Sequence, residues 1–573
     1  MVVATHTRKT EGKKISPNAI RLNPTVTEVL PRAFARLTTR RPKNSLHPLR
    51  KETASGMSKF SFGLVQFLLT TLFLVFHLSI LDAVEVSYEL ENLEGSGVWM
   101  TPLSDRQREL DLNLRATVWF EKQWLGDGEA YERRAKEFSA SKRRELRLRV
   151  IAALKAESKE ANKNASTEIK RLLSRGSISD FETHWIINGF SCSLKSKDLP
   201  LLKTIPGIRK IFIQPVRIQP RSRLPKNEPQ PTLPFPQKPS LKNFPWYIEK
   251  LKADQVWKEF GLAGQGILNV VHDRNFIFSD HLRRNVYRNP GEIPDNGVDD
   301  DGNGYIDDVH GYNFDHQSAD LYTQPFDGNP RSRSILHGTS CATIASGAPS
   351  LSGGPQFGVA PLSRWAGVIN HGGIERSVEW AIEQGADTYS MSFSRGYHGD
   401  YQSHWRKVME HGSFCGVYFV SGAGNRRREA EEPFRMNIPQ SIPKAVFAAA
   451  GIQQDLSKTS FSCVGPVKWD TEHYQDGVVQ KPEVCAFNFK VPCLYPNGEV
   501  VPDLLNGNSY AGPMFCGAIS LMLSADPDLL PWDLHEIITG TATDVGPEGV
   551  DYETGYGLIN CYAAVAEVLR RKK

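Results

Sequence analysis

Three residues that together can perform nucleophilic catalysis are spread along this chain of 573 residues in the order Asp, His, Ser. Asp273 follows an apolar segment at 267–271, His337 is followed by Gly and Thr, and Ser509 precedes an apolar run at 514–523. A serine hydroxyl is a poor nucleophile until a histidine takes its proton and an acid holds the imidazole in the useful tautomer. This pattern predicts Ser509 as nucleophile, His337 as general base and then acid, and Asp273 as the group that orients it.

The elements that must position these residues are predicted to be alternating strands and helices. Strands are predicted at 267–271, 388–393, 416–420 and 445–450, with a helix at 374–384. Such alternation indicates a parallel sheet covered by helices on both faces. Functional residues gather at the carboxyl ends of strands and the first turns of helices in these sheets. Asp273 stands at the first kind of position, and His337 and Ser509 stand at the second.

Several further motifs accompany these residues in a fixed order. They are His337-Gly338-Thr339, Ser421–Asn425 after an apolar strand, Gly507–Pro513, and Gly555–Asn560 near the C-terminus. Together they resemble the motifs of the subtilisin-like serine proteases, over roughly residues 245–570. The resemblance implies an α/β fold with a subtilisin-like parallel seven-stranded sheet and helices on both faces. It also implies a serine endopeptidase that cleaves peptide bonds through an acyl-enzyme and needs no catalytic cofactor.

The resemblance implies roles for residues beyond the triad. Asn425 would donate its side-chain amide to the oxyanion, together with the Ser509 backbone N–H. The implied substrate-binding residues are Ser392, Phe393, Ser394 and Gly424.

Three departures from the family pattern concern the substrate site and the acid. Ser394 and Arg395 replace two glycines, which we expect to narrow or polarise the first pocket. Arg395 and Arg426–Arg428 either favour acidic substrates or form a solvated surface. Asp273 is followed by Arg274-Asn275 where the family has Ser/Thr-Gly, which puts the local turn in question. The alternative function is therefore a catalytically impaired, subtilase-like protein that binds peptides.

The part before residue 245 reads as a precursor segment. Residues 84–165 are charged and favour helices, strands are predicted at 181–187, 189–194 and 208–214, and a helix is predicted at 196–202. The proline-rich stretch 215–244 predicts an extended, protease-accessible linker. Trp185–Phe190 and Ile208–Ile211 resemble the family's inhibitory prodomain, a small α+β unit of ferredoxin-like fold, here at about 165–214. The resemblance implies a prosegment at 84–214 that inhibits the catalytic domain at 245–573 until the linker is cleaved.

The N-terminal residues carry the basic charge and an apolar segment. Residues 1–56 hold twelve Lys or Arg and three Glu, a balance of +9, while the whole chain is +5. Residues 57–573 therefore sum to −4, and nucleic acid is not an expected partner. The segment 57–83 reads either as a signal peptide after an overextended start or as an uncleaved membrane anchor around 63–81. Both alternatives predict export, secreted or periplasmic in the first case and membrane-anchored in the second. We expect a monomer that acts on proteins or peptides.

Eight cysteines are compatible with export. Cys192 lies in the expected prosegment. Cys463, Cys485 and Cys493 lie in a loop-rich stretch and are the best candidates for disulfide bonds. Cys341 and Cys516 stand in helical patterns and are expected to be small core residues.

An acidic segment at 299–308 forms a second cluster. Its alternating oxygen-bearing residues with Gly304 at the turn suit a structural Ca²⁺ loop. The expected ligands are Asp299, Asp301, Asn303, Tyr305 (through its carbonyl) and Asp307. His310 stands where an EF-hand has its closing glutamate, so the motif is incomplete, and an ordinary acidic loop is the alternative.

Overall fold

The computed structural model describes residues 90–103, 110–126, 130–214, 233–322, 336–351, 354–395, 401–425, 436–471 and 473–572. The leader 1–56, the segment 57–83, most of the proline-rich stretch and Arg426–Arg428 lie outside the described residues. The helices described in these ranges are all too short or too polar to cross a membrane. Residues from 84 onward belong to one compact unit.

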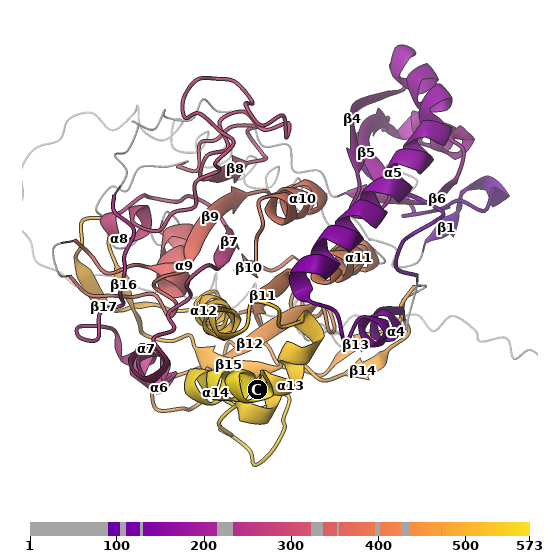
Figure 1. Cartoon of the computed structure of the whole chain (residues 1–573). Helices are drawn as coiled ribbons and strands as arrows, with labels where there is room; N and C mark the ends of the chain where they lie inside the picture. Colours follow the sequence, from indigo (N-terminus) through magenta and orange to yellow (C-terminus); the bar gives the residue numbers. More distant parts are fainter. Residues whose placement is uncertain are drawn as a thin grey trace, which may run out of the picture. The chain divides into compact units, whose positions relative to one another are not determined.

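A seven-stranded parallel sheet forms the centre of the C-terminal part (Figure 1). Its strands, in spatial order, are β15 (Val484–Phe487), β12 (Val446–Ile452), β11 (Tyr418–Gly422), β10 (Thr388–Met391), β7 (Leu268–His272), β9 (Arg364–Ile369) and β8 (Gly311–Asn313). All neighbouring strands pair in parallel. Six of the seven are buried at every residue between two layers, so most of their side chains are apolar on both faces. The predicted seven-stranded parallel sheet is confirmed.

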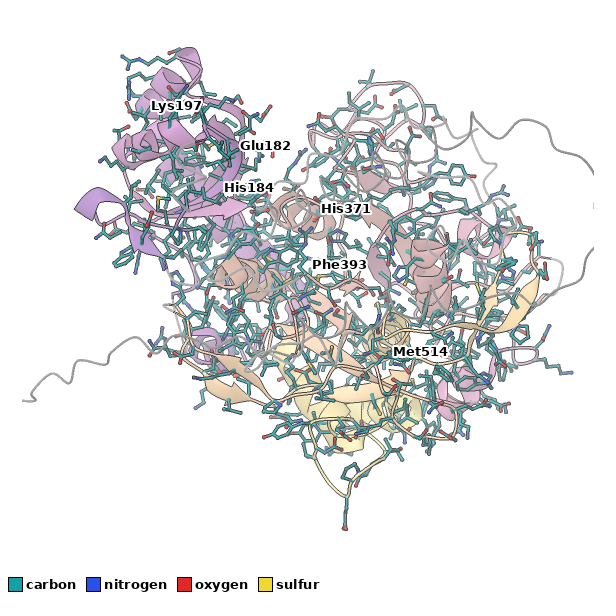
Figure 2. All side chains as sticks on the ribbon, turned by 180° about the vertical axis from the view of Figure 1, so that it is seen from behind. Glu182, His184, Lys197, His371, Phe393 and Met514 are labelled. Atoms are coloured by element: carbon teal, nitrogen blue, oxygen red, sulfur yellow. The ribbon has the colours of Figure 1, made fainter. Side chains whose placement is uncertain are left out.

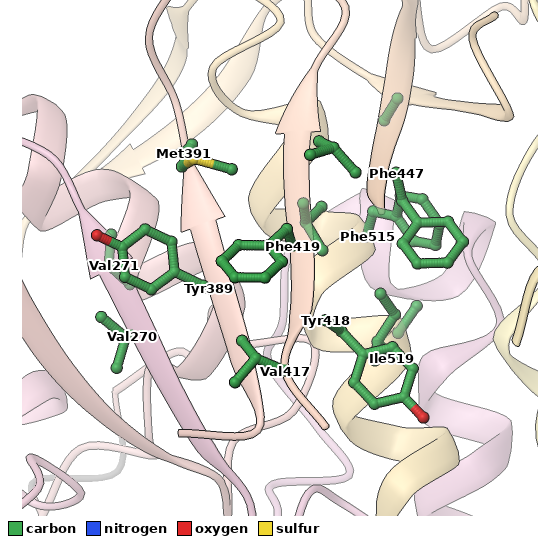
Figure 3. Close-up of a cluster of buried hydrophobic side chains, with 14 of the residues drawn as sticks. Val270, Val271, Tyr389, Met391, Val417, Tyr418, Phe419, Phe447, Phe515 and Ile519 are labelled. Atoms are coloured by element: carbon green, nitrogen blue, oxygen red, sulfur yellow. The ribbon is translucent and has the colours of Figure 1, made fainter. Parts of the chain in front are cut away.

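Helices cover both faces of this sheet. They are α6 (Trp246–Lys250), α7 (Ala253–Phe260), α8 (Asp280–Arg283), α9 (His337–Ser346), α10 (Glu375–Glu383), α11 (Tyr401–Phe414), α12 (Ala511–Ala525), α13 (Pro531–Thr541) and α14 (Cys561–Arg571). Phe419 of β11 packs against Gly412 of α11, while Phe447 of β12 contacts Phe515 of α12 (Figure 3). Phe447 is the register partner of Val420, and residues 419 and 420 point to opposite faces. Helices α11 and α12 therefore lie on opposite faces.

Residues 90–214, here called the N-terminal unit, form a second sheet with the strand order β1-β2-β6-β3-β5-β4. Its elements are β1 (Glu91–Asn92), η2 (Leu93–Gly95), β2 (Trp99–Met100), β3 (Asn113–Phe120), α4 (Ala130–Glu137), α5 (Arg143–Ser174), β4 (Ile178–His184), β5 (Gly189–Lys195), η3 (Ser196–Thr204) and β6 (Ile208–Gln214). Strands β3 to β6, with α5 and η3 between them, follow the β-α-β-β-α-β order of a ferredoxin-like unit.

The prediction that this unit begins at about residue 165 was wrong. Strand β3, at 113–120, lies at the centre of the sheet, and α5 begins at Arg143. The strand was missed because it lies in a charged segment that favours helices, although residues 113–118 alternate polar and apolar side chains as a strand does. Thr117 and Trp119 face the C-terminal part, where they contact Glu375 and His404.

The expected disulfide bonds are not found among the described residues, in which all eight cysteines are buried. The stretch that holds three of them contains strands β13 (Val467–Trp469), β14 (Gly477–Val479), β15, β16 (Val491–Leu494) and β17 (Val500–Leu505). Cys485 is part of the central sheet, and the Cys493 thiol lies 3.6 Å from the Ser340 hydroxyl. Residues 233–245 contain no helix or strand, as expected of a proline-rich linker.

Candidate active site

Asp273 and His337 meet at the carboxyl end of β7. Strand β7 ends at His272, and the Asp273 N–H still donates to the Val368 carbonyl of β9 at 2.9 Å. His337 is the first residue of α9, and its Nδ1 lies 2.7 and 2.9 Å from Asp273 Oδ1 and Oδ2. The Asp273 side chain is 4% exposed. Burial alone would raise the pKa of Asp273, but His337 and the Arg274 N–H outweigh burial and lower it. Since Nδ1 is bound to a carboxylate, Nε2 remains to exchange a proton.

In the turn after Asp273, Asn275 takes the position where the family motif has a glycine. Asn275 has φ +53°, in the left-handed region that Asn enters more readily than other residues with a Cβ. The turn packs closely on the start of α9, because a Cβ on Gly338 would lie 2.6 Å from the Arg274 carbonyl oxygen. Thr339 Oγ1 in turn accepts a hydrogen bond from the Ile277 N–H at 2.9 Å. The turn that follows Asp273 thus packs against Gly338 and Thr339 of the His-Gly-Thr motif.

Ser509 lies two residues before α12, beside α9 and β10. Its carbonyl accepts hydrogen bonds from the Ser392 hydroxyl at 2.8 Å and the Cys341 thiol at 3.4 Å. The next residue, Tyr510, has its ring centroid 5.8 Å from that of His337. The Ser509 hydroxyl donates to the Ser392 carbonyl at 3.3 Å, which is long for a hydrogen bond between two oxygens. Such loose hydrogen bonds are common in active sites without substrate.

Asn425 stands after β11 with its amide orientation fixed. Its Oδ1 accepts the Asn508 N–H at 2.7 Å, so Nδ2 is the outward donor. Nδ2 lies 3.3 Å from the position that a Cβ on Gly507 would occupy, and Gly507 has φ +143°. A side chain at 507 would therefore crowd the amide. Asn425 is exposed, unlike the four residues before it.

Asn508 joins the serine loop to the Asn425 segment, and sequence reasoning missed it. Its Nδ2 donates to the Gly424 carbonyl at 2.6 Å and to Ser462 Oγ at 2.9 Å. Its Oδ1 accepts from Asn488 Nδ2 at 2.5 Å. The residue is 1% exposed, so these bonds are made away from water. The only signal in the sequence is an Asn next to the serine, which does not reveal partners that are 20 to 84 residues away.

The expected substrate-binding residues continue from β10 beside the serine. Gln440 Nε2 donates to the Phe393 carbonyl at 2.7 Å and to Ser394 Oγ at 2.8 Å, so an unpredicted glutamine holds this edge. Ser394 Oγ also lies 3.4 Å from the Cβ position of Gly424, which brings the two segments together. Phe393 is labelled in Figure 2.

Arg395 follows the same edge. Its guanidinium donates to the carbonyls of His371, also labelled in Figure 2, and Gly372, at 2.7 and 3.2 Å. It lies 5.1 Å from the ring centroid of Trp405. Arg426–Arg428, the other arginines of the acidic-substrate hypothesis, lie outside the described residues.

Carboxylates of the acidic segment form a compact cluster, but its residues are not the same as the predicted calcium ligands. Glu292, Asp299 and Asp301 can bring one oxygen each within 4.8 Å of one another, and Glu292 was not predicted. The carboxylate of Asp307 instead accepts the N–H groups of Asn296 and Gly297, and Asn303 Oδ1 accepts the Tyr305 N–H. The structure therefore supports two of the five expected ligands, Asp299 and Asp301, and draws Asp307 into a different turn.

The comparison with known protein families bears on this geometry. The family model described as the subtilase family, Peptidase S8, matches residues 280–557. The match contains His337, Asn425 and Ser509, and Asp273 lies seven residues before it. Residues 280–557 belong to the subtilase family.

Relatives of this chain are about a quarter identical to it over the residues that they match. Fervidolysin of Fervidobacterium pennivorans is 26% identical over 207 residues, which cover 35% of this chain and 28% of fervidolysin. Bacillopeptidase F of Bacillus subtilis is 22% identical over 473 residues, covering 76% of this chain and 30% of its own length. The chain thus spans less than a third of either protein. A crystal structure of MycP1 with its N-terminal propeptide removed has a TM-score of 0.41 and 21% identity, over 56% of this chain and 96% of that one.

The left-handed conformation of Asn275, in the turn after Asp273, leads to a testable prediction. In a Ser509→Ala background, Asn275→Val should lower the free energy of unfolding by about 1–3 kcal/mol, because a β-branched residue is strained at positive φ. Asn275→Gly should lower it by less. Chemical denaturation measures both, with Asn497→Val at an exposed turn as the control. Equal effects of Val and Gly at 275 would contradict this account of the turn.

Proposed function

We propose that the chain is a serine endopeptidase that hydrolyses peptide bonds in protein or peptide substrates through an acyl-enzyme. The observation that carries the proposal is the buried contact between Asp273 and His337 Nδ1, close to the loop of Ser509, whose neighbour Tyr510 has its ring centroid 5.8 Å from that of His337. This contact assigns the imidazole its tautomer and leaves Nε2 as the proton acceptor. The family match over residues 280–557 supports the same chemistry.

The reaction follows from these positions. Ser509 Oγ leaves the Ser392 carbonyl, gives its proton to His337 Nε2 and attacks the substrate carbonyl carbon. The resulting oxyanion receives hydrogen bonds from Asn425 Nδ2 and the Ser509 N–H. His337 then protonates the leaving amine as the peptide C–N bond breaks, and an acyl-enzyme forms. A water molecule, deprotonated by His337, attacks the acyl carbon and restores the Ser509 hydroxyl.

The oxyanion assignment predicts a specific kinetic defect. Asn425→Ala should lower kcat by about 10²–10³-fold with a small change in KM, because the donor acts on charge that develops only in the transition state. Steady-state kinetics on a peptide library measures this, with Asn497→Ala as the control. A parent without measurable hydrolysis would favour the peptide-binding alternative. A normal kcat in Asn425→Ala would remove Asn425 from the mechanism.

We further propose that the protein is exported as a precursor and that the N-terminal unit is its prosegment. The unit ends at Gln214, whose Nε2 donates to Thr117 Oγ1 at 2.6 Å and lies 3.1 Å from the Cβ position of Gly373. Gly373 follows Gly372, whose carbonyl accepts from Arg395 at the substrate edge. The chain thus leaves the unit close to the proposed substrate-binding edge, and the proline-rich sequence follows.

The precursor proposal predicts the mature N-terminus. N-terminal sequencing of purified active protein should find a cut within 215–244, while the Ser509→Ala chain should stay uncut if the cleavage is autocatalytic. An active enzyme that still begins before residue 214 would contradict the precursor mechanism.

Calcium is the metal that the acidic cluster would hold. Glu292 is 5% exposed and its Oε2, among the described residues, has no hydrogen-bond partner. Burial, together with Asp308 and Asp301, raises the pKa of Glu292 against the opposing N–H bonds from Asp300 and Asp301. An unpartnered buried carboxylate oxygen beside Asp299 and Asp301 suits a hard divalent cation. We propose Glu292, Asp299 and Asp301 as ligands of a structural Ca²⁺, with no part in the chemistry.

Removal of calcium should therefore destabilise the protein. Saturation at 100-fold above Kd stabilises the folded state by about 2.7 kcal/mol, so a chelator should lower the Tm by several degrees. Glu292→Gln should lose most of this response, whereas Asp307→Asn should keep it. Scanning calorimetry of the Ser509→Ala chains, in CaCl₂ and in chelator, measures these differences in Tm. An equal Tm with and without calcium would make the cluster an ordinary acidic loop.

A further inference from the structure

Helix α11 is buried on every side although it is rich in polar residues. Its His404, Lys407 and His411 are each 0% exposed. They are spaced three and four residues apart, which places them on one face of the helix. The N-terminal unit covers that face, since His404 contacts Trp119 and both Lys407 and His411 contact Leu125.

Both nitrogens of His411 are bound to backbone groups of the N-terminal unit. The Leu125 N–H donates to Nε2 at 3.2 Å, so Nε2 must carry a lone pair. Nδ1 contacts the Ile186 carbonyl, to which it donates. The docked imidazole is therefore neutral, with its proton on Nδ1. A second proton on Nε2 would point at the Leu125 N–H and break that bond.

A fixed cation stands one helical turn away from His411. Lys407 Nζ donates to the carbonyls of Leu125 and Gly126 at 2.9 and 2.6 Å. Burial, with Lys407 adding its charge, lowers the pKa of His411 to about 3 against the opposing bond to Ile186. When the unit is undocked, water reaches this face and an ordinary histidine has a pKa of about 6.5. Acid therefore favours the undocked state through this residue.

Other titratable groups at the interface act in the opposite sense or are neutralised. His184 Nδ1, on β4, lies 3.8 Å from Glu379 (Figure 2). Burial lowers the pKa of His184, but Glu379 and Glu375 outweigh it and raise it, so this residue favours docking in acid. Burial also raises the pKa of Glu379, whose Oε1 accepts the Ile186 N–H.

The carboxylates beside His404 and His411, those of Glu375 and Glu410, are paired. His404 Nε2 lies 2.7 Å from Glu375 Oε1, and its Nδ1 accepts the Trp119 indole N–H at 2.9 Å. On α11 itself, Glu410 is bound to Arg406 at 2.8 Å and to the Tyr474 hydroxyl at 2.8 Å. Lys210 of β6 contacts His473. His411 differs from these groups in that its ring nitrogen accepts the Leu125 N–H while the Lys407 side chain lies one helical turn away.

We propose that His411 makes the docking of the N-terminal unit acid-sensitive: protonation of its Nε2 cancels the bond to Leu125 and releases the unit from α11. The inference rests on the proposed function only in treating this unit as a prosegment. Docking is measured in a Ser509→Ala chain, so its outcome is independent of whether the protein is a protease. For one group that is neutral when docked and has a pKa of about 6.5 when undocked, the docking constant falls about 30-fold between pH 7.5 and 5.0.

Hydrogen exchange in the full-length Ser509→Ala chain measures this docking. Protection of the backbone amides at 121–126 and 185–190, corrected for intrinsic rates at each pH, reports opening of the interface, and α12 serves as the internal reference. His411→Gln is the matched variant, because its amide can accept from Leu125 and donate to Ile186 without titrating. The loss of protection from pH 7.5 to 5.0 should be about 30-fold larger in the parent than in His411→Gln. Because His184 acts in the opposite sense, His184→Gln should enlarge the parent's loss.

An equal pH response in the parent and His411→Gln would overturn the proposal. Should His411→Gln lose protection of α12 at pH 7.5, His411→Asn is the second neutral variant and is judged by the same comparison. A loss confined to α12 and absent from 121–126 would also overturn it, because acid would then act on the core rather than on the interface.

Discussion

The contact between Asp273 and His337 is the interaction on which the candidate active site depends. A carboxylate that is 4% exposed is costly unless donors surround it, and His337 Nδ1 and the Arg274 N–H supply them. The sheet fixes the carboxylate, because Asp273 still pairs with Val368 of β9. Helix α9 fixes the imidazole, because Gly338 docks on the turn that Asn275 closes. The turn, the strand and the helix thus share one task, which is to present Nε2 to a serine.

The serine side is held by a separate buried network. Asn508 connects the loop before α12 to the carbonyl of Gly424, and its own N–H orients Asn425. Asn508 therefore ties the position of Ser509, the proposed nucleophile, to that of Asn425, the proposed oxyanion donor. On the opposite face of the sheet from α12, the N-terminal unit meets α11 through histidines and a lysine rather than through apolar side chains alone. An interface of this kind is specific when its protons are in place and weak when they are not.

The sequence reveals local patterns well and distant partners poorly. Strands β7 and β10 could be predicted because they are apolar runs. The triad motifs could be predicted because they lie at the ends of strands and helices. Strand β3 was missed because it stands in a charged segment that favours helices, although its residues 113–118 alternate polar and apolar side chains. Asn508 and Gln440 contact residues far along the chain, and Glu292 lies outside the acidic run that it completes. The cysteines at 463, 485 and 493 were misread because short strands separate them in a stretch that looks like loop.

The most direct test of the account is covalent labelling by a serine-directed fluorophosphonate, followed by peptide mass spectrometry. A neutral serine reacts only if a base takes its proton, so labelling reports the assembled triad without assuming any substrate preference. We predict one adduct, on Ser509, that is lost in Ser509→Ala and strongly slowed in His337→Ala, once the N-terminal unit has been removed or released. A mature protein that remains unlabelled, or that is labelled on a different serine, would contradict the assignment of Asp273, His337 and Ser509 as a working triad.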